Sequence, residues 1–125
     1  MVYLIDANII IRFLVGDHQE HLEIATEIFT KIENGEYEVE ILESVVMEVL
    51  FVLVKFYKLP QSEVIKDLKK IISFRGVVGD KVLLVETLNI VEYKNIDFVD
   101  ALICAKSRLQ EYGRLSFDKD VNKKC

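Results

Sequence analysis

Two acidic residues follow directly after short apolar runs that are predicted to be strands. Asp6 follows VYLI and Asp118 follows LSF, so we expect both at the carboxyl end of a strand. In α/β proteins, ligands bind beyond these strand ends. Carboxylates there can bind a divalent cation. Alternatively, Asp6 can cap the next helix and Asp118 can lie in a polar turn.

A third acid lies in a helix that is otherwise apolar. Glu48 is the one charged residue in VVMEVLFVLV, and we expect this helix to be buried because it is apolar on every side. A buried glutamate needs a partner, because an isolated buried carboxylate is costly. That partner is either a cation or a basic side chain such as Arg12 or Arg108.

Two further acids, Asp97 and Asp100, are three residues apart in IDFVDALICAK. On a helix this spacing puts both on one face. Acids in a first turn also complement the helix dipole. That explanation fits Asp97 better than Asp100, which apolar residues follow directly.

Together these acids indicate a metal site. If Asp6, Glu48, Asp100 and Asp118 converge, their four charges can ionise together only when a cation neutralises them. Mg²⁺ and Mn²⁺ prefer such oxygen ligands. Sites of this kind serve phosphoryl chemistry, because the metal activates water and stabilises charge on the phosphate. The chain has no glycine-rich nucleotide-binding motif and no GxSxG motif.

The elements that must position the acids alternate between strands and helices. Strands are predicted over residues 2–5, 37–41, 77–78 and 115–117, the first of them buried. Helices are predicted over residues 8–15, over the segment that Asp17 can cap and Gly35 ends, over 44–57, from Pro60, and over 80–89 and 97–111, the last ended by Gly113. This alternation favours an α/β fold with a mainly parallel sheet covered by helices on both faces.

Length and composition favour a single compact domain over residues 1–125. Hydrophobic residues make up 51% of the chain, enough for a packed core. The net charge of −5 argues against binding nucleic acid by bulk charge alone, although a nucleic-acid enzyme can concentrate acids at a metal.

Cysteines and apolar runs indicate the compartment. Cys104 and Cys125 are too few for a disulfide framework, so we expect a small buried side chain at Cys104 and a frayed end at Cys125. No apolar run approaches the ~20 residues that span a bilayer, and the N-terminus lacks the pattern of a signal peptide. We therefore expect a soluble, cytoplasmic protein.

Four segments, in this order, resemble the PIN domain and in particular the VapC-type toxins of prokaryotic toxin–antitoxin pairs. They are LIDANIIIRFL, SVVMEVLFVL, IDFVDALICAK and LSFDKD. The resemblance runs from Val2 to about Val121. It implies a PIN-like three-layer α/β/α sandwich with a short, mainly parallel central sheet, and a metal-dependent endoribonuclease that hydrolyses RNA.

The resemblance also implies roles for single residues. Asp6, Glu48, Asp100 and Asp118 take the places of the four catalytic acids, which would hold one or two Mg²⁺ or Mn²⁺ ions. We expect Asp6 and Asp100 to bind directly, and Glu48 and Asp118 through water. Four residues match supporting positions of the family: Asn8, Asp97, Ser116 and Asp120.

A VapC-type protein would form a homodimer and bind a cognate antitoxin that blocks the site. Two alternatives stay open. One is a PIN-fold binding module with weakened catalysis, for which the short C-terminal segment VNKKC leaves room. The other is a PIN nuclease of RNA processing without a toxin role.

Overall fold

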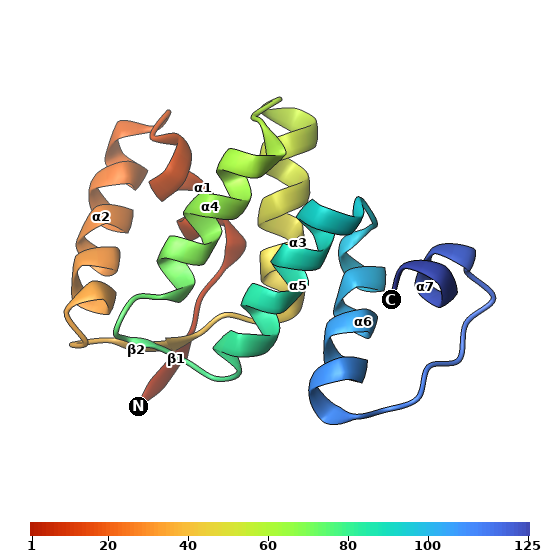
Figure 1. The fold of residues 1–125 in the computed structure, drawn as a ribbon. Coiled ribbons are helices and arrows are strands. Elements are labelled where there is room, and N and C mark those ends of the chain that lie inside the picture. The colour runs from red at the N-terminus through yellow and green to blue at the C-terminus, as the bar shows by residue number, and fades with distance from the viewer. The chain divides into compact units, whose positions relative to one another are not determined.

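The chain folds as two compact units, Met1–Gly79 and Asp80–Cys125. Figure 1 shows them in a computed structural model, which describes residues 1–125 except for the side chain of Asp120. The first unit has the element order β1–α1–α2–β2–α3–η1–α4–β3, and the second contains α5, α6 and α7. Strands and helices thus alternate in the first unit, as predicted.

The sheet belongs to the first unit and is parallel. Its strands are β1 (Val2–Leu4), β2 (Glu38–Glu40) and β3 (Val77–Val78), paired in that order. Tyr3 is aligned with Val39, and Val39 with Val77. Parallel neighbours need crossover connections, and helices supply both of them here.

The first crossover contains α1 (Ala7–Val15) and α2 (Gln19–Glu33). Gly16 ends α1 in the left-handed conformation, at φ 69°. The prediction that Asp17 caps α2 is wrong: His18 is the cap, and its Nδ1 accepts a hydrogen bond from the His21 amide at 3.3 Å. Asp17 instead forms an ion pair with Arg12 at 3.2 Å.

The second crossover contains the apolar helix predicted over residues 44–57, which consists of two parts in the structure. α3 (Glu43–Phe51) continues into a π-helical turn, η1 (Val52–Phe56). The Tyr57 amide closes this turn by donating to the Val52 carbonyl at 3.2 Å. α4 (Gln61–Ile72) then begins after Pro60, as predicted.

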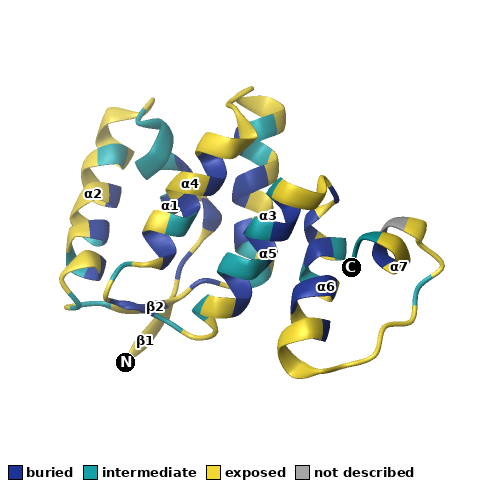
Figure 2. Cartoon of the chain, in the orientation of Figure 1, coloured by how far each residue is buried: buried dark blue, intermediate teal, exposed yellow. Residues whose placement is uncertain are grey.

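The core of the first unit comes from one side of each helix and from β2 (Figure 2). Phe29 stacks on Phe13 with ring centroids 4.4 Å apart. Gly76 lets the chain pass closely before β3, since a Cβ there would collide with the Tyr37 carbonyl oxygen. The side chains buried most completely include Ile10, Phe29, Ile32, Val46, Leu53, Ile65, Leu68 and Ile72.

The prediction of a buried first strand is wrong. Val2, Tyr3 and Leu4 are 53%, 45% and 68% exposed, and the chain becomes buried only at Ile5. In the described sheet β1 pairs with β2 on one side. The fourth strand, predicted over residues 115–117, is absent from the described structure, and Leu115 and Phe117 are fully exposed.

The second unit contains α5 (Lys81–Lys94), α6 (Phe98–Gln110) and α7 (Lys119–Lys124). Asp80 caps α5 by accepting from the Leu83 amide at 3.0 Å, and α5 runs five residues beyond the predicted end at residue 89. α6 ends at Gln110, and its C-cap is Glu111 (φ 57°) instead of Gly113. α7 was not among the helices predicted from the sequence.

The cysteines also differ from the prediction. Cys104 is fully buried, as expected, but it forms a disulfide with Cys125, and their Cα atoms are 5.3 Å apart. Val121 of α7 is 1% exposed. The C-terminal residue is therefore tied to α6 and is not frayed.

None of the described helices combines the length and the apolar composition that crossing a bilayer requires.

Burial predicts different costs for two leucine truncations in the first unit. Leu68 is 1% exposed, so Leu68→Ala should lower the free energy of unfolding by about 2–5 kcal/mol. Leu4 is 68% exposed, and Leu4→Ala should change it by no more than about 0.5 kcal/mol. Urea denaturation measures both, and equal losses would contradict an exposed β1.

Candidate metal centre

Asp6 lies where the chain leaves β1 and enters α1. It is extended (φ −83°, ψ 147°), and its Oδ1 accepts a hydrogen bond from the Asn8 amide at 2.7 Å. The side chain is exposed, and its negative charge is favourable at the positive end of the helix dipole. The cap interpretation is confirmed, because Asp6 Oδ1 caps the helix. Cation binding by the other carboxylate oxygen stays a prediction.

Glu48 lies on the solvent-facing side of α3, so the prediction that it is buried is wrong. The buried side of α3 consists of Val46, Val49 and Leu50. An apolar helix can thus bury one face and still expose large apolar residues on the other. Glu48 lines an open pocket of about 510 Å³ together with Ser44, Val45, Met47 and Phe51.

The two basic partners considered for Glu48 form ion pairs with other acids. Arg12 binds Asp17, whose Oδ2 also accepts a hydrogen bond from the Tyr57 hydroxyl at 3.3 Å. Arg108 lies 3.9 Å from Glu86. Each arginine is therefore paired with an acid of its own unit.

Asp97 and Asp100 lie at the start of α6. Asp97 is the exposed N-cap residue, and Asp100 is half-buried in the first turn. Only Asp100 is therefore within the helix itself. Asp100, the more buried of the two, is also the acid whose position the helix dipole explains less well.

Asp118 precedes α7 and does not end a strand, which corrects the prediction that it shares a sheet edge with Asp6. Its amide donates to Ser116 Oγ at 2.9 Å, and its carbonyl accepts from the Asn122 amide at 3.2 Å. Ser116 thus fixes the turn that carries this acid. The side chain of Asp120 lies outside the described part of the chain.

Each unit carries two of the four acids, Asp6 and Glu48 in the first and Asp100 and Asp118 in the second. Within either unit, the described His, Cys, Asp and Glu side chains form no group of three that could hold a metal ion. The chemistry of the set still fits a divalent cation, because all four side chains offer carboxylate oxygens.

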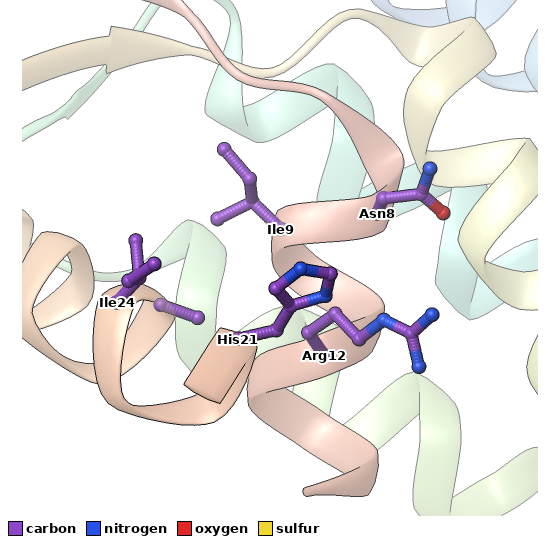
Figure 3. Close-up of a pocket in the computed structure, with 6 residues that line it drawn as sticks. Asn8, Ile9, Arg12, His21 and Ile24 are labelled. Atoms are coloured by element: carbon purple, nitrogen blue, oxygen red, sulfur yellow. The ribbon is translucent and has the colours of Figure 1, made fainter. Parts of the chain in front are cut away.

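A pocket that the sequence analysis did not predict lies between α1 and α2 (Figure 3). Its volume is about 180 Å³, and its lining residues are Asn8, Ile9, Arg12, His21, Ile24 and Ala25. Asn8 and Arg12 are one helical turn apart and extend from the same side of α1. The four-residue spacing of Asn8 and Arg12 on one helix was the signal in the sequence that could have predicted their part of the pocket. The place of His21 could not be predicted in this way, because it depends on how α2 packs against α1.

A comparison with protein-family models decides the family. The model of the PIN domain matches residues 3–125, which include all four acids. The chain belongs to the PIN domain family. No match was found among curated proteins.

PIN domains are a family of nucleases, so the protein has a nuclease fold. Family members generally use divalent metal ions and act on nucleic acid. The predicted fold class, an α/β/α PIN-like fold with a short parallel sheet, is confirmed.

The Asp6 cap predicts that two substitutions will differ in stability. Asp6→Ala removes the acceptor of the Asn8 amide and should lower the free energy of unfolding by about 0.5–2 kcal/mol. Asp6→Asn keeps an acceptor oxygen and caps equally well, so it should cost much less. Thermal and urea denaturation of both variants test this. Equal losses would show that the cap does not stabilise α1.

Proposed function

We propose that this PIN domain is a metal-dependent endoribonuclease that hydrolyses RNA phosphodiester bonds. The observation that carries the proposal is the family match over residues 3–125, because that span includes every proposed acid. The structure adds support at one of them. Asp6 combines an exposed carboxylate with a fixed backbone at the end of β1.

Asp6 and Asp100 are proposed to bind Mg²⁺ or Mn²⁺ directly, and Glu48 and Asp118 through water. Once bound, such an ion supplies an activated water and stabilises the charge that develops on the phosphate. The protein's own contribution is to hold the oxygens in place. The Asn8 amide orients Asp6, and Ser116 Oγ orients the backbone at Asp118.

Substrate binding is proposed to depend on local contacts. The net charge of −5 disfavours a general attraction to phosphates. Arg12 and His21 line a pocket together with Asn8, which follows Asp6 by two residues. These two side chains are therefore proposed to contact RNA there.

The VapC-type resemblance carries the finer proposals: a toxin role, a homodimer, and an antitoxin that covers the acids. A PIN nuclease of RNA processing shares the chemistry but not the antitoxin. A PIN-fold binding module shares neither metal binding nor cleavage. Mn²⁺ titration with an RNA cleavage assay separates the module from the nucleases.

The proposed function predicts that cleavage of a labelled RNA requires Mg²⁺ or Mn²⁺ and stops with EDTA. Asp6→Asn and Asp100→Asn should each lower the cleavage rate by more than about 100-fold, since even outer-shell partners of a metal cost about 10–100-fold. Both variants should unfold at nearly the wild-type temperature.

Asp67→Asn is the matched control, because Asp67 is an exposed aspartate on α4 with no proposed role. It should cleave RNA at the wild-type rate. Wild-type cleavage by Asp6→Asn, or cleavage that continues in EDTA, would contradict the assignment. Absence of both Mn²⁺ binding and cleavage in the wild type would favour the binding module.

A further inference from the structure

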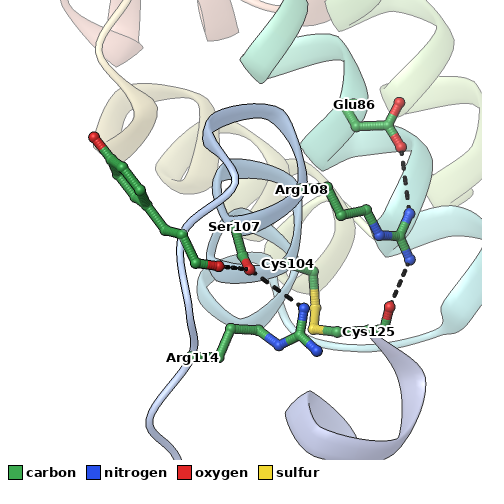
Figure 4. The surroundings of a disulfide bond; sticks show 7 residues. Glu86, Cys104, Ser107, Arg108, Arg114 and Cys125 are labelled. Carbon is green, nitrogen blue, oxygen red and sulfur yellow. Dashed lines mark hydrogen bonds and ion pairs between the residues drawn. A yellow bond between two sulfur atoms is a disulfide. The ribbon is translucent and has the colours of Figure 1, made fainter.

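In the second unit, one disulfide bond joins two cysteines that are distant in sequence. Cys104 lies in the middle of α6 and is fully buried, while Cys125, 21 residues later, is half-buried. Figure 4 shows their disulfide beside Arg108. The bond therefore joins the end of the chain to the interior of α6.

The other contacts that hold the C-terminal segment are individually weak. Arg108 donates from Nη2 to the Cys125 carbonyl oxygen at 3.0 Å and lies 3.9 Å from Glu86, but its side chain is 42% exposed. Exposed pairs of this kind contribute little. Val121 adds one fully buried side chain. The disulfide is thus the strongest restraint on α7.

The connection from α6 to α7 depends on that restraint. Its first part is held by Ser107, whose hydroxyl donates to the Tyr112 carbonyl at 2.6 Å (Figure 4). Beyond it, Leu115 and Phe117 are fully exposed. Near Asp118, the connection is held from α7, where Asn122 Nδ2 donates to the Ser116 carbonyl at 2.9 Å. The position of α7 therefore determines that of Asp118.

We propose that the Cys104–Cys125 disulfide is a redox switch that orders residues 111–125 when oxidised and releases them when reduced. Through Asp118 the switch regulates cleavage, and this last part rests on the proposed function. Extended segments with few buried contacts open at low free-energy cost. Loss of the crosslink leaves noncovalent restraints, among them the burial of Val121 and the hydrogen bonds of Arg108 and Asn122.

A dithiol is the proposed reductant. Its thiolate attacks Sγ of Cys125, the more exposed of the two cysteines, and forms a mixed disulfide while Cys104 leaves as a thiolate and takes up a proton. The second thiol of the reductant then displaces Cys125. Two cysteine thiols and one cyclic disulfide of the reductant result, so two electrons and two protons pass to the protein.

Hydrogen exchange with mass spectrometry tests the switch in the whole chain. In air-equilibrated protein, neither cysteine should react with iodoacetamide, and after dithiothreitol both should react. Reduction should raise the exchange rates of amides in residues 115–124 by at least about tenfold and leave α4 unchanged. Two reactive cysteines before reduction, or unchanged exchange afterwards, would overturn the switch.

Cys125→Ser is the control variant, because it removes the bond and leaves the buried Cys104 in place. It should exchange like reduced wild type, with or without dithiothreitol. Exchange like the oxidised wild type would show that the disulfide does not order the segment.

RNA cleavage tests the regulatory part separately. Reduction should lower the cleavage rate of wild type by about tenfold or more and leave Cys125→Ser at one low rate. Faster exchange with unchanged cleavage would overturn the regulation. Wild-type cleavage by Asp6→Asn would instead overturn the proposed function, and the exchange result would stand.

Discussion

The hydrogen bond from the Asn8 amide to Asp6 joins the end of β1 to the start of α1, and the proposed chemistry depends on it. It keeps Asp6 extended and satisfies one of the amides that a helix leaves unpaired at its N-terminus. Only one carboxylate oxygen accepts this hydrogen bond, so the side chain is oriented while its second oxygen stays available as a proposed metal ligand. The parallel pairing of β1 with β2 then determines the place of this acid at the carboxyl end of the sheet.

Charge sets the second constraint. Carboxylates brought together raise the free energy of the fold unless a cation neutralises them. Members of the PIN domain family generally use divalent metal ions. The second unit adds a constraint of another kind. Asp118 lies in a connection with exposed apolar side chains, and a disulfide closes that connection onto α6. One acid is thus held by a helix cap and another by a crosslinked segment.

Features that depend on neighbouring residues were predicted correctly from the sequence. Predictions were wrong or missing for features that depend on contacts between residues distant in sequence. The Asp6 cap, the strand and helix order of the first unit and the parallel sheet follow from local patterns and were found. The burial of Glu48 was wrong because composition does not tell which faces of a helix meet a partner. The strand over residues 115–117 needs a neighbouring strand that the local pattern cannot guarantee, and the Cys104–Cys125 pair requires the chain to turn back through α7.

The claim that four carboxylates hold a divalent cation is tested most directly by a crystal structure grown with Mn²⁺ and measured at the manganese absorption edge. We predict anomalous density bonded to carboxylate oxygens of Asp6 and Asp100, with Glu48 and Asp118 contacting its water ligands. Manganese bound elsewhere on the chain, or no anomalous density near Asp6 at saturating Mn²⁺, would contradict the assignment.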